Sequence, residues 1–219
     1  MTLTTTPELQ QLAKEHLWMH FTRMGGYADA DVPIIVRGEG CYLEDVDGKR
    51  YLDALAGLFS VNIGYSFGDE IGQAAHEQMR ELPFYTNWSY GHPKAIELAA
   101  EVASLAPGDL SRVFFCSGGS EAVESAWKLA RQYYLAKGSK LPRYKAIARR
   151  IAYHGTTFGA LTLNGIPAIR EPFEPLVPEV SHLSNTNRYP LPPHETEEEF
   201  TRFLLDELEE AIAAMGAET

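Results

Sequence analysis

Residues 113–136 combine the residue types and the spacing of an anion-binding turn. A β-branched and aromatic run predicts a buried strand over 112–116, and apolar side chains at helical spacing predict a helix over 119–136. The turn between them consists of Ser117, Gly118, Gly119 and Ser120. A strand, a glycine turn and a helix in this order direct free backbone N–H groups and the positive end of the helix dipole at one point. The turn therefore predicts a phosphate site, and the next acidic residues, Glu121 and Glu124, suit the start of the helix.

The phosphate predicted at this turn does not belong to a nucleotide. A nucleotide-binding Walker loop ends in Gly-Lys-Ser/Thr, and a dinucleotide fold carries Gly-x-Gly-x-x-Gly, but neither pattern is present here. The sequence from Ser117 to Arg131 instead resembles the phosphate-binding turn, or phosphate cup, of the class III (omega) aminotransferases. That family holds pyridoxal 5'-phosphate (PLP), so the resemblance implies a PLP cofactor bound by residues 117–120.

A second segment strengthens the resemblance. Tyr153, His154 and Gly155 follow a strand predicted over 145–152, at the sheet edge where open parallel sheets bind ligands. In class III aminotransferases a Tyr-His-Gly at this place covers the cofactor ring and lines the site. The resemblance implies that Tyr153 stacks on the PLP ring, and Gly155 would let the ring lie close.

The N-terminal part resembles the small domain of the same family. Residues 40–53 and 56–59 carry this likeness, and it implies that Leu58 and Phe59 line the substrate pocket. As plain sequence, both could equally be core residues. The loop that contains Trp88 resembles a segment that reaches toward the partner subunit's site in the family's dimers, so Trp88 is a third pocket candidate.

The catalytic lysine of the family has no counterpart here. PLP chemistry needs a lysine amine and a carboxylate against the pyridine nitrogen, and in the family both lie beyond the region that matches this sequence. None of the seven lysines stands in a matching context; they are Lys14, Lys49, Lys94, Lys128, Lys137, Lys140 and Lys145. We therefore assign no catalytic residue within this chain and expect it to be inactive alone.

Composition narrows the possible partners. The 219 residues carry a formal net charge of −11, which disfavours nucleic acid or an anionic membrane as partner. No apolar run reaches the roughly 18 residues of a membrane span, and residues 1–8 lack a basic and an apolar region, so we expect neither a membrane anchor nor export. No metal site is predicted, and Cys41 and Cys116 form no Cys-x-x-Cys pair. We expect a reduced, cytoplasmic protein.

Periodicity and turn signals predict the order of the elements. A helix over 8–24, a β-meander over 34–52 with a turn at Asp47-Gly48, and an ordered connector over 53–65 come first. Helices over 69–82 and 92–106 precede the strand and helix around the glycine turn, and residues 167–193 are mostly loop. The last helix starts at the capping box Thr196-x-x-Glu199 and ends at Gly216.

The alternation of strands and helices predicts an α/β fold. A small-domain segment of mixed α and β structure over 1–68 is followed by a PLP-transferase-like large domain over 69–219 with a mainly parallel sheet. The final helix feeds no further strand, so we expect the front part of a longer protein, with uncovered apolar surfaces that favour aggregation.

Three functional hypotheses remain open. The leading one is a PLP-dependent aminotransferase that moves an amino group from an ω-amino acid or amine to a keto acid such as pyruvate, and family members are homodimers. A related fold-type I PLP decarboxylase or aminomutase would share the same cup. A truncated, non-catalytic fragment that binds PLP or phosphate is the third.

Overall fold

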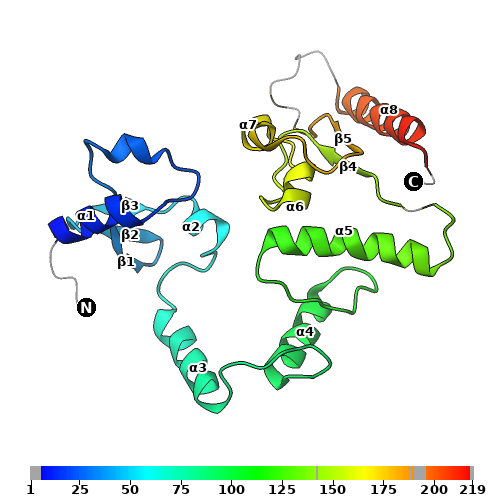
Figure 1. The fold of residues 1–219 in the computed structure, drawn as a ribbon. Coiled ribbons are helices and arrows are strands. Elements are labelled where there is room, and N and C mark those ends of the chain that lie inside the picture. The colour runs from blue at the N-terminus through cyan, green and yellow to red at the C-terminus, as the bar shows by residue number, and fades with distance from the viewer. Residues whose placement is uncertain (1–5, 142, 188, 190–195, 218–219) are drawn as a thin grey trace. The chain divides into compact units, whose positions relative to one another are not determined.

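The chain divides into two compact units, Met1–Ile96 and Glu97–Thr219, in a computed structural model that describes residues 6–141, 143–187, 189 and 196–217 (Figure 1). In its described residues, each unit contains one small sheet, three-stranded in the first and two-stranded in the second. Helices and strands alternate along the second unit, which confirms the α/β class. The proposed boundary between residues 68 and 69 stays a prediction.

The first unit is built on an antiparallel meander. Its strands pair in chain order, which confirms the meander predicted over 34–52; they are β1 (Ile35–Glu39), β2 (Tyr42–Asp45) and β3 (Arg50–Leu52). The Asp45 carboxylate accepts bonds from the N–H groups of Asp47 (3.0 Å) and Lys49 (2.9 Å) and from the Tyr51 hydroxyl (2.6 Å). The Tyr51 bond contributes most to lowering the pKa of Asp45. One carboxylate therefore organises the predicted Asp-Gly turn.

The helices of the first unit match their predictions unevenly. They are α1 (Thr6–His16), η1 (Met24–Tyr27), α2 (Ala56–Phe59), α3 (Gly68–Glu81) and α4 (Pro93–Leu105), which crosses into the second unit. The last two confirm the helices expected over 69–82 and 92–106. The helix predicted over 8–24 is too long, because the regular helix ends at His16.

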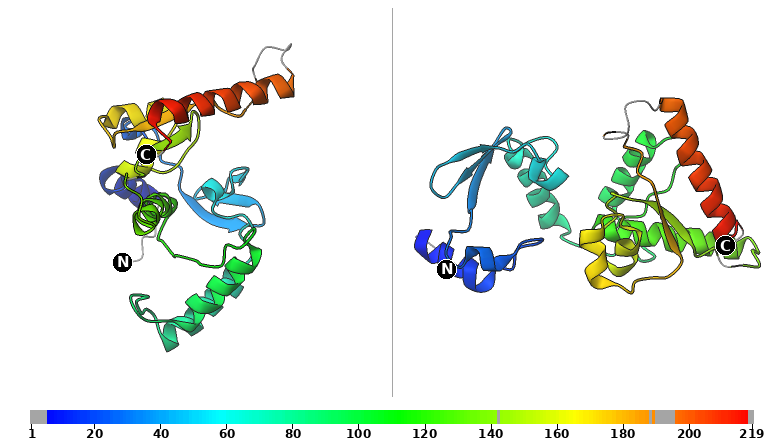
Figure 2. Two further views of the ribbon diagram at one scale, coloured as in Figure 1. Left: turned by 90° about the vertical axis from the view of Figure 1, so that its right-hand side faces the viewer. Right: turned by 90° about the horizontal axis from the view of Figure 1, so that it is seen from above.

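The second unit places a parallel pair of strands between helices. Its elements are α5 (Gly119–Ala136), β4 (Ala146–Arg149), α6 (Phe158–Leu163), α7 (Pro167–Arg170), η2 (Glu171–Phe173), β5 (Val180–Leu183) and α8 (Glu197–Met215). β4 and β5 pair in parallel, with Ala146 opposite Val180 and Arg149 opposite Leu183. Figure 2 shows α8 beside this strand pair.

The core of the second unit lies where these elements meet. Ala148 on β4, Ala160 and Leu161 on α6, and Phe200 on α8 are buried. α6 packs on α5, β4 and β5, so this short helix connects the strand pair to the long helix. The core therefore fixes the position of the loop between β4 and α6 relative to α5.

One prediction in this unit is wrong and another is incomplete. Residues 112–116 form no strand, and Phe114 is 79% exposed, because no described segment offers the N–H and C=O groups that a strand must pair with. Among the described residues of 167–193, which leave out 188 and 190–193, the short elements α7, η2 and β5 interrupt the predicted loop. The four residues of β5, Val-Ser-His-Leu, are too few for periodicity to identify a strand.

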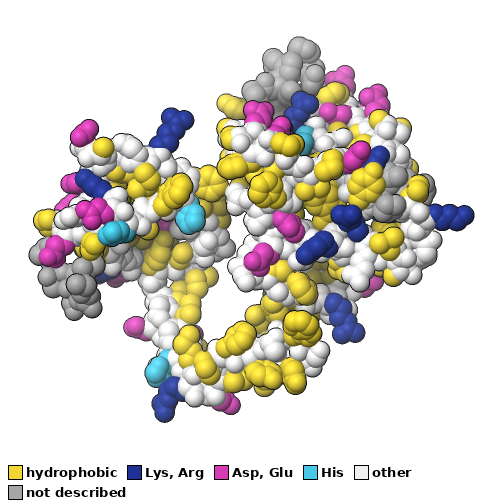
Figure 3. All heavy atoms as spheres, in the orientation of Figure 1, with side chains coloured by type: hydrophobic (Ala, Val, Ile, Leu, Met, Phe, Trp, Pro, Cys, Tyr) yellow, Lys and Arg dark blue, Asp and Glu magenta, His cyan; other side chains and the backbone are white. Residues whose placement is uncertain are grey.

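Apolar side chains gather along α3 and along α4 (Figure 3). Ile71 and Met79 on α3 and Ile96 and Leu105 on α4 are exposed. Within the described part of the chain, neither helix packs extensively on another helix or strand. Nor does any described helix have the length and apolar character to cross a membrane.

The predicted capping box at the start of α8 is confirmed and can be tested. The Thr196 hydroxyl accepts from the Glu199 N–H (3.2 Å), and the Glu199 carboxylate accepts from the Thr196 N–H (2.9 Å). We expect Thr196→Ala to lower the free energy of unfolding by about 1 kcal/mol in urea denaturation. Thr201→Ala, at an exposed interior position of the same helix, should be neutral or slightly stabilising. Equal losses in both variants would contradict the capping role.

Candidate functional site: the glycine turn at the start of α5

The N-terminus of α5 presents backbone donors that the fold leaves open. Gly118 is the N-cap, in extended conformation (φ −167°, ψ 167°), with no capping side chain. Helical hydrogen bonding begins when the Ala122 N–H donates to the Gly118 carbonyl (3.1 Å). Among the described residues, no group accepts from the N–H groups of Gly119, Ser120 or Glu121. Three donors therefore remain at the positive end of an 18-residue helix.

The two glycines leave space around these donors. A methyl group at the Cβ position of Gly118 or Gly119 would meet no atom within 4 Å. An anion could therefore reach the main chain without displacing a side chain, and the residues present fit the phosphate group of PLP.

The predicted second segment lies against the turn. The Thr156 N–H donates to the Ser120 Oγ (3.0 Å), 36 positions apart in sequence. Gly155 is buried and has φ +121°, and a Cβ there would lie 2.9 Å from the Ser120 Cα. We expected Gly155 to make room for a cofactor ring. The structure shows that its missing side chain lets the backbone contact Ser120, and its place beside a cofactor ring stays a prediction.

The other residues of that segment remain accessible. Tyr153 is 56% exposed, and His154 is half-buried. The fold thus brings Gly155 and Thr156 into contact with Ser120, and Tyr153 and His154 directly precede them in the chain. Ring stacking by Tyr153 stays a prediction.

Glu121 modifies the prediction for the turn. Its carboxylate accepts a hydrogen bond from the Ser117 N–H (2.9 Å). The Ser117 N–H is therefore already bonded, and the open donors begin at Gly119. Ser117 contributes shape to the turn, while Gly119 and Ser120 offer the N–H groups.

Glu124 has a role that the sequence did not reveal. We placed it at the start of its own helix, but its carboxylate accepts from the Thr157 hydroxyl and from the N–H groups of Gly159 (3.0 Å) and Ala160 (3.3 Å). The pKa of Glu124 is lowered chiefly by Thr157. Glu124 therefore caps α6 from α5 and holds the loop after Tyr153 in place. A local sequence pattern cannot predict a contact between residues more than 30 positions apart.

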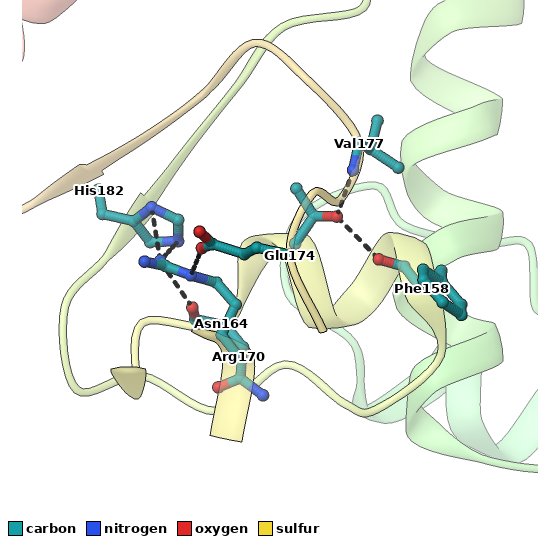
Figure 4. Close-up of polar contacts among 7 residues, drawn as sticks. Phe158, Asn164, Arg170, Glu174, Val177 and His182 are labelled. Atoms are coloured by element: carbon teal, nitrogen blue, oxygen red, sulfur yellow. Dashed lines mark hydrogen bonds and ion pairs between the residues drawn. The ribbon is translucent and has the colours of Figure 1, made fainter. Parts of the chain in front are cut away.

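A polar cluster formed by Asn164, Arg170, Glu174 and His182 also contacts this loop, through Asn164 (Figure 4). The buried Asn164 donates its amide to the Gly155 carbonyl (2.9 Å), and Arg170 donates to the Asn164 carbonyl (3.3 Å). The same Arg170 nitrogen lies 3.1 Å from both ring nitrogens of His182, and its Nε lies 3.0 Å from Glu174. Burial, followed by the charge of Arg170, lowers the pKa of His182. No pattern in the sequence points to these residues, because they meet only in the folded chain.

An open cavity of about 570 Å³ lies beside the turn but does not suit the phosphate. Its lining residues are Phe114, Phe115, Cys116, Ser117, Glu121, Glu124, Ser125, Lys128 and Thr157. Two carboxylates face this space with one lysine, whereas Gly118, Gly119 and Ser120 do not line it. An anion would therefore be repelled from the cavity and favoured at the open amides. Among the described residues, no cluster of three or more acidic, His or Cys side chains could hold a metal ion.

The three pocket candidates belong to the first unit. Leu58 is 65% exposed, Phe59 is 73% exposed and Trp88 is 84% exposed. They are therefore surface residues rather than core residues in the described chain. Their role in a substrate pocket stays a prediction.

Comparison with known families decides the assignment. The model of the family "Aminotransferase class-III" matches residues 27–219. The chain belongs to this family. This class III aminotransferase chain is 48% identical over 211 residues to a protein of Mycobacterium tuberculosis named a probable aminotransferase, covering 96% of this chain and 44% of that protein. It is 36% identical over 220 residues to the putrescine–pyruvate aminotransferase of Pseudomonas aeruginosa, covering 100% of this chain and 48% of that enzyme.

Solved structures show the same relationship. An (S)-enantioselective omega-transaminase from Thermomicrobium roseum superposes with a TM-score of 0.94 at 41% identity, covering 100% of this chain and 48% of that one. The omega transaminase of Pseudomonas jessenii in complex with PMP gives 0.91 at 34% identity, covering 96% and 47%. The aminotransferase chain thus spans about half the length of the relatives it matches.

Gly119 and Gly155, which lie on the two segments that meet at Ser120, should respond differently to substitution by alanine. Gly119→Ala meets no neighbour, so we expect unchanged thermal stability but about ten-fold weaker PLP binding, because the methyl group hinders access to charge-assisted donors. Gly155→Ala should lower the free energy of unfolding by more than about 1 kcal/mol, because φ is positive and Ser120 lies in the way. Equilibrium dialysis and thermal denaturation measure both effects. Equal affinity in Gly119→Ala would argue against phosphate binding at this turn.

The hydrogen bonds from Thr157, Gly159 and Ala160 to Glu124, here called the Glu124 bridge, predict that the stability of the fold depends on pH. Because the folded-state pKa of Glu124 is lowered from its usual 4.5, its contribution to stability is present above that value and is lost as the pH falls through the lowered pKa. We expect Glu124→Gln to lower the urea midpoint at about pH 7 and to change it much less at about pH 3. Glu210→Gln, on the exposed surface of α8, should change it at neither pH. A Glu124→Gln effect of the same size at both pH values would contradict the bridge.

Proposed function

We propose that the protein containing this chain is a PLP-dependent aminotransferase that transfers an amino group from an ω-amino acid or amine to a keto acid such as pyruvate. Membership of the class III family supports the reaction type. The names of two similar proteins support the substrate classes, since one is a putrescine–pyruvate aminotransferase and another an omega-transaminase. The observation that carries the proposal is the open, glycine-lined N-terminus of α5 joined to the Tyr153–Gly155 segment.

The residues of this chain would bind and orient the cofactor. The N–H groups of Gly119 and Ser120 would hold the phosphate, and Gly118 keeps its approach clear. Ser120 also orients the loop, since its Oγ accepts from Thr156 and its hydroxyl proton remains available to the phosphate. Tyr153 would cover the ring, and His154 would line the site beside it. Bound PLP would supply the electron sink that makes amino transfer possible.

Other residues would shape the substrate site. Leu58, Phe59 and Trp88 expose apolar surface that suits the carbon skeleton of an amine. We propose that the active form is a homodimer, as the family resemblance implies. No lysine of this chain stands in a catalytic context, so the 219-residue chain alone should bind without turnover.

Two polypeptides test the proposal. The 219-residue chain and the protein as its gene encodes it are incubated with PLP, β-alanine or putrescine, and pyruvate, and alanine formation is measured. We expect PLP binding by the chain without alanine formation, and alanine formation by the encoded protein. Release of carbon dioxide or internal amino migration would favour the related decarboxylase or aminomutase. Alanine formation by the chain alone would contradict the absence of a catalytic lysine.

A further inference from the structure

The turn that carries Leu58 and Phe59 has an unusual backbone. Four consecutive residues have positive φ: Ala56 (49°), Gly57 (57°), Leu58 (60°) and Phe59 (63°). Helical bonds close around them, from the Phe59 N–H to the Leu55 carbonyl (2.8 Å) and from the Ser60 N–H to the Ala56 carbonyl (2.9 Å). α2 is therefore one left-handed helical turn. Only Gly57 adopts this conformation without steric cost, and L-residues avoid such runs.

A single carboxylate holds this turn. One oxygen of Asp53 accepts from the Leu55 N–H (3.2 Å), and the other accepts from the Gly57 N–H (2.8 Å) and the Tyr65 hydroxyl (2.6 Å). The bond from Tyr65 is the largest cause of the lowered pKa of Asp53. Asp53 thus contacts the turn at its beginning and at its centre.

Tyr65 anchors the carboxylate to the sheet. Its ring lies so close to Gly38 on β1 that a side chain there would collide with it. Its N–H donates to the Gly40 carbonyl (2.9 Å) in the β1–β2 turn. The left-handed turn is therefore tied through Asp53 and Tyr65 to the most regular part of the first unit.

The strained turn does not bury its two large apolar side chains within the described residues. Leu58 and Phe59 are both largely exposed, so the conformation adds no apolar burial in the described chain. Strained backbone persists where the surroundings enforce it, and it concentrates at binding sites. A flexible loop would present the same two side chains in many orientations, whereas a fixed turn presents them in one.

We infer that Asp53 and Tyr65 are positioning residues that preform an apolar wall from Leu58 and Phe59 for the substituent of the amine substrate. The inference rests on the proposed function. Asp53 and Tyr65 would thus act on the choice of amine through Leu58 and Phe59, by favouring amines with apolar or aromatic substituents. Loosening the pair should therefore change which amine is preferred more than it changes the transfer step.

The first unit provides a matched control. Tyr51 donates to Asp45 (2.6 Å) as Tyr65 donates to Asp53 (2.6 Å), and each bond raises the pKa of its tyrosine. Tyr65→Phe and Tyr51→Phe thus remove the same kind of bond, but only the first lies at the left-handed turn. Asp53→Asn is a second variant that removes the charge and keeps the volume.

The experiment measures selectivity and local opening in the encoded protein loaded with PLP. The ratio of kcat/KM for 1-phenylethylamine to that for β-alanine should fall about five- to ten-fold in Tyr65→Phe and Asp53→Asn, a factor within the range of the net contribution of one hydrogen bond. In Tyr51→Phe the ratio should stay unchanged. Amide hydrogen exchange at Gly57 and Phe59 should accelerate about ten-fold in the first two variants only.

The measurements distinguish a failure of the positioning role from a failure of the proposed aminotransferase function. An active wild-type enzyme whose selectivity and exchange are unchanged by Tyr65→Phe would overturn the inference and leave the proposed function standing. Faster exchange with unchanged selectivity would also overturn it, because the pair would then support only the fold. A wild-type protein that transfers no amino group from any amine would overturn the proposed function and the selectivity role together.

Discussion

The contact between Ser120 and Gly155 is the interaction on which the candidate site depends. It joins the start of α5 to the loop after β4 through one hydrogen bond from Thr156, and it is possible only because residue 155 lacks a side chain and adopts φ +121°. Glu124 also joins α5 to this loop, but the contact at Ser120 is the one that lies directly at the open amides. With it, the open amides lie next to the loop that begins two residues after Tyr153, which is the arrangement that the proposed cofactor site requires.

Several interactions support this contact from different sides. Glu124 reaches from α5 to the N–H groups at the start of α6, and Asn164 holds the Gly155 carbonyl from the end of the same helix. Arg170 then ties Asn164 to the region of β5. These bonds hold backbone atoms of the loop, which leaves the open amides and the exposed ring of Tyr153 for a ligand. A preorganised site of this kind loses less entropy on binding.

The sequence predicted the parts of the fold that local rules determine. Helical spacing identified α5, the capping box identified α8, and Asp47-Gly48 identified the hairpin, because each signal lies within a few residues. Local rules missed the features that depend on distant residues. β5 has too few residues for a periodic pattern, and residues 112–116 find no pairing strand among the described residues. Glu124 binds residues more than 30 positions away. The left-handed α2 was missed for the same reason, since Asp53 and Tyr65 enforce a conformation that Leu58 and Phe59 would not adopt alone. The turn pattern predicted a phosphate site at residues 117–120, whereas the assignment of that phosphate to PLP came from the family resemblance.

The central claim is that the open amides at the start of α5 bind the phosphate of PLP. Backbone ¹⁵N NMR of the chain, titrated with PLP and in parallel with pyridoxal, which lacks the phosphate, tests this directly. The account predicts that PLP shifts the amide signals of Gly119 and Ser120 most strongly and that pyridoxal leaves them in place. Shifts of equal size with both compounds, or PLP shifts confined to residues away from this turn, would contradict it.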